Sequence, residues 1–231
     1  MSKDFNNACL EEFRKCFKAL RNSSKAIGMK AYMRNQFDFC GVQAQDRRHA
    51  VKAIVTHFEW DDQNDFIEFI RLCWQQDQRE YKYLALDLSR RFIHKLDTKC
   101  IPFFEQLIIT DSWWDTVDGI APQIIGRLIQ NDKARIQEQA SKWIQDDNIW
   151  NQRSALILQL FYKEKTDFEL LTDCILRTSK SKEFFIEKAA GWALRQYSKT
   201  NPERVKIFLA ENKIPSLSFR EGMKYILQKA L

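Results

Sequence analysis

The stretch Asp111-Ser-Trp-Trp-Asp-Thr-Val-Asp-Gly119 lies near the middle of this 231-residue chain and predicts the start of a helix. Ser112, followed three residues later by Asp115, has the spacing of a capping box, in which two side chains satisfy the first free N–H groups of a helix. Proline removes a backbone N–H and clashes with the preceding turn. We therefore expect this helix to be broken or kinked at Pro122 and to resume through Ile129.

Two faces of this helix differ in composition. Trp113 falls on an apolar stripe with Val117 and Ile120, so we expect it to lie in the core. Trp114 and Asp118, four residues apart, share another face. A large aromatic ring beside a carboxylate on a face away from the core is not explained by packing. These two residues are therefore the first candidates for a functional role.

The rest of the chain also has helical periodicity. Only 6 glycines and 4 prolines are present, which argues against an all-β protein with its many turns. We find no pattern that predicts a strand. Further helices are expected at about 4–21, 24–34, 45–58, 62–75, 78–95, 98–109, 133–145, 148–163, 167–179, 184–198, 201–212 and 216–230.

A weak repeat with a period of 35 residues runs through five units. Its reference positions, which we call the ridge, are Arg48, Tyr83, Asp118, Arg153 and Lys188. A small or apolar residue follows two positions later in each unit: Ala50, Ala85, Ile120, Ala155 and Ala190. Helix pairs repeated in this way predict an all-α fold, an α-solenoid of HEAT-like repeats, with an irregular helical bundle as the alternative. The ridge would line the concave face, and we treat residues 1–231 as a single domain.

Two helices carry further candidate site residues. Arg153 lies on an apolar helix and needs a partner, and Asp118 occupies the equivalent position one repeat earlier. Packed helices are about 8–10 Å apart, so a salt bridge between them is feasible, whether functional or merely structural. Trp192 lies between Lys188 and Arg195 on one helix face. This pattern suits a nucleic acid, although two cations covering a half-buried indole would look the same.

Composition restricts the class of protein. The net charge of +6, from 37 basic and 31 acidic residues, is compatible with a polyanionic partner without being diagnostic of one. The six cysteines are scattered without metal-ligand spacing, so we expect reduced thiols and no metal. The three histidines are far apart, which gives a hydrolase triad little support. No apolar run is long enough to span a bilayer, and a soluble, cytoplasmic protein is expected.

Several segments together form a specific combination that runs over nearly the whole chain. They are Met29-Lys-Ala-Tyr-Met-Arg34, the aromatic loop leading into Arg47-Arg48, Trp113-Trp-Asp-Thr-Val-Asp118, Asn148-Ile-Trp-Asn-Gln-Arg153, Phe184-Phe-Ile-Glu-Lys-Ala-Ala-Gly-Trp192, Leu194-Arg195 and Asn201-Pro202. This combination resembles the AlkD family of bacterial alkylpurine DNA glycosylases, which are built of HEAT-like repeats.

The resemblance implies a site and an activity. The family's catalytic set matches Trp114, Asp118, Arg153 and Trp192, and the implied reaction is hydrolysis of the N-glycosidic bond of N3- or N7-alkylated purines in duplex DNA. The family is thought to work from the DNA backbone side without a tight pocket for the base. DNA-binding residues are expected at Tyr32, Arg48, Phe184, Lys188 and Arg195. We expect no cofactor, a monomer, and association with the bacterial nucleoid when DNA is bound.

One segment departs from the family pattern. Residues 38–45 read Asp-Phe-Cys-Gly-Val-Gln-Ala-Gln, where family members often carry Leu-Gly-Ile followed by Thr-Pro, in a loop that helps to approach DNA. In the whole loop, residues 36–45, we expect the aromatic residues to be exposed. Two other functions remain open, a non-catalytic DNA-binding solenoid and a protein-interaction scaffold. The intact catalytic set favours the glycosylase.

Overall fold

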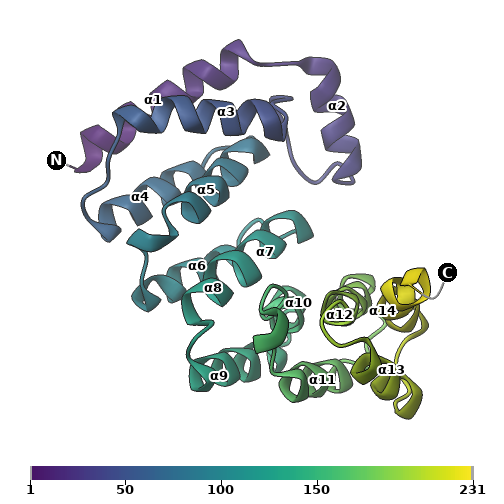
Figure 1. The fold of residues 1–231 in the computed structure, drawn as a ribbon. Helices are drawn as coiled ribbons and strands as arrows, with labels where there is room; N and C mark the ends of the chain where they lie inside the picture. The colour runs from purple at the N-terminus through teal and green to yellow at the C-terminus, as the bar shows by residue number, and fades with distance from the viewer. Residues whose placement is uncertain (1, 230–231) are drawn as a thin grey trace. The chain divides into compact units, whose positions relative to one another are not determined.

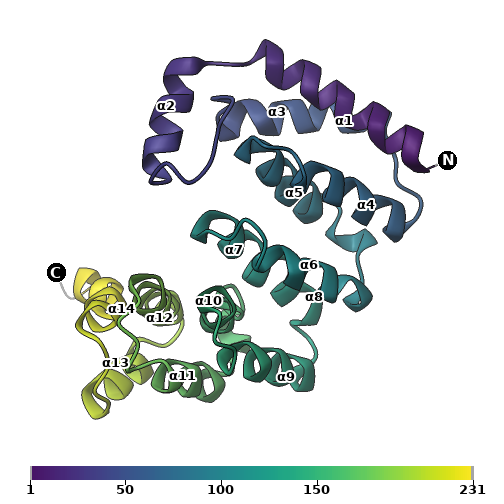
Figure 2. The same ribbon diagram turned by 180° about the vertical axis from the view of Figure 1, so that it is seen from behind.

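The computed structural model describes residues 2–229, and over this range the chain is helical (Figures 1 and 2). Within that range no β-strand occurs, apart from an isolated bridge between Asp38 and Gln78. The α-helices are α1 (Ser2–Ala19), α2 (Ser23–Tyr32), α3 (Ala44–Ile54), α4 (Gln63–Trp74), α5 (Arg79–Arg91), α6 (Ile101–Ile108), α7 (Trp114–Ile120), α8 (Gly126–Ile129), α9 (Lys133–Ile144), α10 (Ile149–Ile157), α11 (Phe168–Arg177), α12 (Phe184–Tyr197), α13 (Pro202–Glu211) and α14 (Ser216–Lys229). A π-helical segment, Ala121–Ile125, joins α7 to α8.

The predicted helices correspond to these elements, with differences at their ends. The largest difference is at the helix expected over 148–163, where α10 already ends at Ile157. The chain then turns, and Lys163 has a positive φ of 53°, which a continuing α-helix does not allow. Residue 230, where the last helix was expected to end, lies outside the described residues.

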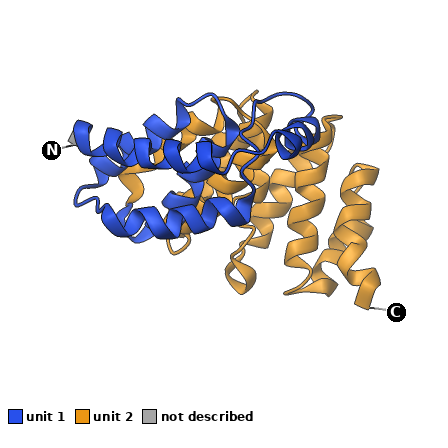
Figure 3. Ribbon diagram, turned by 90° about the horizontal axis from the view of Figure 1, so that it is seen from above, with its two compact units in different colours: residues 1–96 blue, residues 97–231 orange. Residues whose placement is uncertain are grey.

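The chain divides into two compact units, residues 1–96 and 97–231 (Figure 3). The prediction of a single domain stays a prediction. In the first unit α1 packs against α3 and α4, and α5 packs against the same two helices. Helix α2 is different, because none of its residues is buried. It extends away from the α1–α3 pair in both ribbon views (Figures 1 and 2).

The second unit is built of stacked helix pairs. Helix α7 packs on α10, α10 on α12, and α12 on α14, while α9 packs on α11 in the other row. Figures 1 and 2 show the two rows. The small or apolar residues of the repeat, Ala50, Ala85, Ile120, Ala155 and Ala190, are all buried. This arrangement is that of an α-solenoid, so the predicted fold class and repeat register are confirmed.

The predicted capping box at Ser112 is wrong. Helix α7 begins at Trp114, and Trp113, with an extended backbone, occupies the position before it without a side-chain cap. The Ser112 hydroxyl instead donates a hydrogen bond of 2.7 Å to the carbonyl of Ile108, at the end of α6. Ser112 therefore closes the preceding helix, because a serine hydroxyl bonds equally well to the carbonyl four residues back.

The interruption expected at Pro122 takes the form of the π-helical segment. In a regular helix the carbonyl of Asp118 would accept from the N–H of residue 122, which proline lacks. The side-chain amide of Gln123 donates to this carbonyl at 3.2 Å instead. Pro122 and Gln123 thus fix the helix just beyond Asp118 without leaving its backbone unsatisfied.

The loop at 36–43 is hydrogen-bonded to a buried carboxylate. Glu80, at the start of α5, accepts hydrogen bonds from the backbone N–H groups of Cys40, Gly41 and Val42 at 3.0, 2.8 and 3.1 Å. The expectation that the loop aromatics are exposed is wrong for Phe39, which is buried. Phe37 is half-buried beneath the guanidinium of Arg79. The loop is therefore a fixed part of the first unit.

The cysteines are free thiols, most of them buried. All six cysteines are free thiols, and four are buried: Cys9, Cys73, Cys100 and Cys174. Burial raises the pKa of Cys100 and Cys174 to about 12, which keeps them protonated and unreactive. Among the described residues, no helix has the length and apolar composition needed to cross a bilayer.

Two helical glycines allow a matched test of this packing. A Cβ added at Gly191 of α12 would lie 2.4 Å from Cβ of Glu221 and 2.9 Å from the carbonyl oxygen of Ser218, both on α14. We expect Gly191→Ala to lower the free energy of unfolding by about 1–3 kcal/mol, because α14 must move away. Denaturant titration measures this change.

The control is Gly28→Ala in α2, where an added Cβ meets nothing within 4 Å. The same substitution there removes a flexible helical glycine and is expected to be neutral or stabilising by roughly 0.5–1 kcal/mol. Equal stability of the two variants would contradict the close packing of α12 on α14.

Candidate active site

The centre of the candidate site is an ion pair between adjacent repeats. Asp118 lies on α7 and Arg153, 35 residues later, on α10. Nε of Arg153 donates to Oδ1 of Asp118 and Nη2 donates to Oδ2, both at 2.8 Å. This side-by-side geometry is the strongest form of an arginine–carboxylate contact and fixes the plane of the carboxylate. The contact expected from the repeat spacing is therefore present.

Arg153 has a third acceptor. Its Nη1 donates to the backbone carbonyl of Phe185, in the first turn of α12, at 2.6 Å. All three guanidinium nitrogens thus have acceptors within the protein, and only 5% of the side chain is exposed, against 16% for Asp118. One arginine therefore ties α7, α10 and α12 together and directs the carboxylate, while the carboxylate retains some contact with the surface.

Phe185, whose carbonyl accepts from Arg153, has its ring in an aromatic cluster. The rings of Trp113, Trp150 and Phe185 contact one another, with centroid distances of 5.7 Å for Trp113–Trp150, 5.0 Å for Trp113–Phe185 and 5.1 Å for Trp150–Phe185. Trp113 is half-buried, so the expectation that it enters the core on the stripe of α7 is wrong. It precedes the helix and joins the cluster instead. Among the buried side-chain nitrogen and oxygen atoms of the described residues, Nε1 of Trp113 is the one without a hydrogen-bond partner.

The ionisation of Asp118 reflects two opposing effects. Burial raises the pKa of Asp118 above its ordinary value of 3.8, and the hydrogen bonds and charge of Arg153 act in the opposite direction without cancelling the shift. Asp115, one turn earlier on α7, raises it further. Asp118 is thus a carboxylate with a perturbed pKa and a fixed orientation, which is a common property of functional groups.

The other predicted catalytic residues lie on the same set of helices. Trp114 is the first residue of α7, one turn before Asp118, and Trp192 lies on α12; both are half-buried. Phe184 is the first residue of α12, is 49% exposed, and packs edge-on against Phe185 with ring centroids 5.5 Å apart. Phe184 is therefore joined to the Arg153 contact through its neighbour.

Lys188 and Arg195, predicted to bind DNA, have a shared partner that the sequence did not indicate. Nζ of Lys188 donates to Glu221 of α14 at 2.7 Å, and Arg195 donates to the other oxygen of the same carboxylate. Lys224 is a third donor to Glu221. Burial acts to raise the pKa of Glu221, but the hydrogen bonds and charges of these cations outweigh it and lower the pKa to about 2.

Tyr32 and Arg48 belong to the first unit and are described within it. Tyr32 ends α2 and is 70% exposed, and Arg48 is an exposed residue of α3. The neighbouring Arg47 is buried instead: its Nε donates to Asp87 at 2.7 Å and its guanidinium lies over the Tyr83 ring. Of the two consecutive arginines, one therefore holds α3 to α5 and the other faces solvent.

Sequence reasoning missed Glu221 and Phe185. Glu221 is 33 residues after Lys188, whereas a sixth step of the 35-residue repeat falls on Met223, so the repeat does not point to Glu221. Phe185 acts through its backbone carbonyl, for which no residue type gives a signal.

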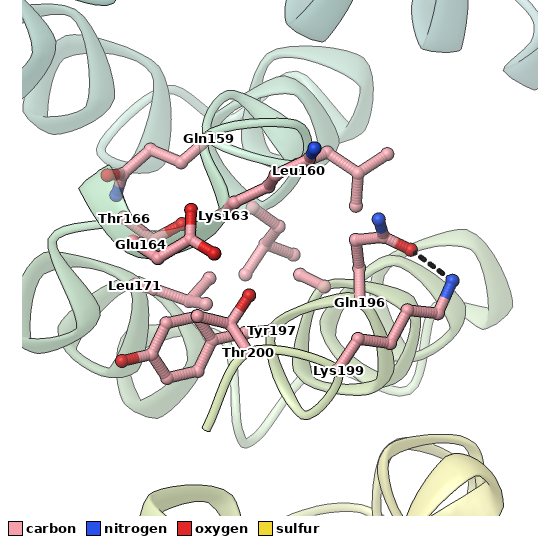
Figure 4. Close-up of a pocket in the computed structure, with 12 residues that line it drawn as sticks. Gln159, Leu160, Lys163, Glu164, Thr166, Leu171, Gln196, Tyr197, Lys199 and Thr200 are labelled. Atoms are coloured by element: carbon pink, nitrogen blue, oxygen red, sulfur yellow. Dashed lines mark hydrogen bonds between the residues drawn. The ribbon is translucent and has the colours of Figure 1, made fainter. Parts of the chain in front are cut away.

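A separate cavity of about 210 Å³ lies between α10, α11 and α12 (Figure 4). Apolar side chains, among them Leu156, Leu171 and Tyr197, form part of its wall, and Gln196 and Lys199 are bonded to each other at one side (Figure 4). None of the predicted site residues lines this cavity, and every one of them lies within the described part of the chain. Within residues 2–229, no group of three or more His, Cys, Asp or Glu side chains is arranged to hold a metal ion.

Comparison with known proteins shows the family of the chain and its fold. Residues 13–226 match a family model described as DNA alkylation repair enzyme. A solved structure described as a predicted DNA alkylation repair enzyme from Enterococcus faecalis has 33% sequence identity and a TM-score of 0.82, covering 89% of this chain and 96% of that one. Another, of smu.31 from Streptococcus mutans UA159, is similar in fold, with 19% identity, a TM-score of 0.57, and coverage of 75% and 90%. Among curated proteins, none matches.

The energy of the central pair can be measured by a double-mutant cycle. Arg153→Met leaves the Asp118 charge buried without its partner, so we expect a loss of about 3–5 kcal/mol in the free energy of unfolding. Combining it with Asp118→Asn is expected to cost less than the sum of the two single changes, because the second change removes the stranded charge. Denaturant unfolding at neutral pH gives the coupling energy.

An exposed pair on α11 is the control for this cycle. Asp173 and Arg177, both 52% exposed, form an ion pair at 2.7 Å, which is expected to contribute under about 1 kcal/mol. A coupling energy for Asp118 and Arg153 no larger than for this surface pair would contradict a central structural role.

Proposed function

Because the chain belongs to the DNA alkylation repair enzyme family, we propose that it is a DNA glycosylase that removes cationic N3- and N7-alkylated purines from duplex DNA. The proposed substrates are 3-methyladenine and 7-methylguanine, and the proposed process is base excision repair. The observation that carries the proposal is the Asp118 carboxylate, held on both oxygens by Arg153 and still partly exposed.

The chemistry of the substrate makes one carboxylate sufficient. Alkylation at N3 or N7 gives the purine a positive charge, so the base leaves without needing a proton from an acid. Two tasks remain: stabilising the positive charge that develops on the deoxyribose, and supplying the water that attacks it. A fixed anion next to the reacting carbon performs the first task, and a carboxylate oxygen can hold the water for the second.

Asp118 is the residue we propose for both tasks. Arg153 occupies one direction of approach to each carboxylate oxygen, and a carboxylate has about four acceptor sites, so positions remain for a water molecule. Arg153 is a positioning residue, because its nitrogens already have acceptors within the protein. This position explains why an arginine is required there: lysine lacks the planar fork that holds both oxygens at once.

Trp114 and Trp192 complete the proposed catalytic set. The face of an indole ring attracts positive charge, most strongly where water is excluded. Both tryptophans are half-buried, which leaves ring surface available to a sugar. We propose that they flank the damaged deoxyribose, where they would stabilise the developing cation together with Asp118.

The proposed contacts to the DNA strand use the remaining predicted residues. Lys188 and Arg195 supply positive charge, and Phe184 supplies an exposed ring on the same helix. Tyr32 and Arg48 would add an exposed ring and a cation from the first unit. Cations that meet phosphates, combined with rings that meet sugars or bases, are typical of DNA-binding surfaces.

The first test is release of damaged bases. We expect the wild-type protein to release 7-methylguanine and 3-methyladenine from methylated duplex DNA, and Asp118→Asn to lose at least about 100-fold in the single-turnover rate, because the fixed anion is gone. Asp115→Asn, a neighbouring carboxylate change on α7, is the matched control and should keep most of the activity. Assays below the unfolding temperature of each variant separate catalysis from stability.

Other outcomes would change the assignment. Efficient release of the uncharged lesions uracil or hypoxanthine would contradict a mechanism that depends on a cationic base. No base release by the wild type, with salt-sensitive DNA binding retained, would favour a non-catalytic DNA-binding repeat protein in which Asp118 and Arg153 are only a structural bridge. DNA binding that is weak and independent of salt would favour a protein scaffold.

The pH dependence of the rate gives a separate prediction. Only ionised Asp118 can stabilise a cation, so we expect kcat/KM to fall as pH decreases through a pKa above 3.8. Because folding raises this pKa, binding of a proton to Asp118 adds to the stability of the fold. This addition is full below the unfolded pKa and is lost as pH rises through the folded pKa. Protonation of Asp118 therefore reduces activity without itself unfolding the protein.

Arg153→Lys is the informative variant for this profile. Lysine keeps the charge but loses the two-bond fork, so the acid limb of the profile should move to higher pH. Circular dichroism across the same pH range checks that the fold persists. An unchanged acid limb in this variant would contradict control of Asp118 by Arg153.

A further inference from the structure

Three basic side chains converge on one buried carboxylate at the contact between α12 and α14. Lys188 and Lys224 both donate to Oε1 of Glu221, and Arg195 donates to Oε2. The Glu221 side chain is only 4% exposed, whereas those of Lys188, Arg195 and Lys224 are 40%, 31% and 49% exposed. The anion therefore lies inside and the cations lie at the surface.

The two helices hold this cluster in a fixed arrangement. Gly191 has no space for a Cβ, because Glu221 and Ser218 of α14 lie directly against it. The hydroxyl of Ser218 donates to the backbone carbonyl of Glu187 at 2.9 Å, which joins α14 to α12 one residue before Lys188. The three cations are thus brought together by backbone packing as well as by their shared carboxylate.

The cluster has an excess of positive charge and unused donors. Three cations and one carboxylate give a net charge of +2. A lysine ammonium has three N–H donors and an arginine has five, so the contacts with Glu221 leave donors available at the exposed ends. A group with two acidic oxygens could bridge two of these cations, and its negative charge would relieve their mutual repulsion.

The position of Trp192 indicates which anion fits. Trp192 is four residues after Lys188 and three before Arg195, so the indole shares a face of α12 with both cations. Trp192 is also one of the two rings that we propose to flank the damaged sugar. In a DNA strand, a phosphate is only a few bonds away from that sugar. A sugar held against Trp192 would therefore bring a phosphate close to Lys188 and Arg195.

We propose that Lys224, together with Lys188 and Arg195, forms a binding site for backbone phosphates of duplex DNA, organised by Glu221 at the contact between α12 and α14. This inference rests on the proposed function for the choice of DNA as the ligand. It extends that function to α14, a helix that the sequence motifs do not include, and assigns Glu221 as a positioning residue. The cations are held in place before DNA arrives, which lowers the entropy lost when each contact forms.

The test compares the salt dependence of DNA binding in two matched lysine variants. Lys224 pairs with Glu221 three residues before it, and Lys206 of α13 pairs with Glu203 in the same way; their side chains are 49% and 44% exposed. Binding of an undamaged duplex is measured by fluorescence anisotropy over a range of salt concentrations. Each phosphate contact contributes about 0.9 to the slope of log affinity against log salt in B-form DNA.

We expect Lys224→Met to reduce the magnitude of this slope by about 0.9, and Lys206→Met to leave it unchanged. An unchanged slope for Lys224→Met would overturn the inference. An equal reduction in both variants would also overturn it, because it would reflect only the net charge. Lys224 is half-exposed, so the variant should fold; Lys224→Gln provides a second variant, and thermal unfolding checks both.

The failure of this inference can be distinguished from failure of the proposed function. The binding assay uses undamaged DNA and does not depend on base release. If Lys224→Met has the same salt slope as the wild type and the wild type releases damaged bases, the Lys224 site alone is rejected. A slope change without any base release would support the phosphate site and reject the glycosylase.

Discussion

The contact between Asp118 and Arg153 is the constraint on which the second unit depends. Removing two charges from water costs hydration free energy, which is offset only when the pair has excellent hydrogen-bond geometry. Here the guanidinium donates to both carboxylate oxygens and to the carbonyl of Phe185. These three bonds involve three helices that are neighbours in one row, α7, α10 and α12. A small displacement of any of the three helices would break a bond to a buried charge. The pair therefore fixes the register of the repeats where the candidate catalytic carboxylate lies.

The residues around this pair satisfy or position two backbone carbonyls, those of Asp118 and Phe185. Pro122 cannot donate to the carbonyl of Asp118, and the π-helical segment with the Gln123 amide supplies the replacement. Phe185 has to present its carbonyl at the start of α12, and its ring is held by Trp113 and Trp150. Phe185 thus contacts Arg153 through its backbone carbonyl and the two tryptophans through its ring. This explains why Trp113 lies outside the regular stripe of α7.

Two carboxylates of the second unit have pKa values shifted in opposite directions. Burial raises the pKa of Asp118, and one arginine does not reverse the shift. At Glu221, three cations outweigh burial and the pKa falls to about 2. Glu221 is therefore a permanent charge suited to holding other side chains in place. Asp118 has a perturbed pKa and a fixed orientation, which suit a group that acts on a substrate.

The sequence by itself determined the helical class, the repeat register and the pairing of Asp118 with Arg153. These follow from periodicity, because a small or apolar residue at a constant offset sets the register in which equivalent residues of adjacent repeats lie side by side. Only the structure showed that Ser112 closes α6, that Phe39 is buried, and that Glu221 accepts from Lys188, Arg195 and Lys224. The Ser112 hydroxyl could bond to a backbone N–H of the following helix or to a carbonyl of the preceding one, and the structure shows the second. The partners of Glu80 and Glu221 are some 26 to 40 residues away, apart from Lys224, and local residue patterns do not specify which distant donor a buried carboxylate meets.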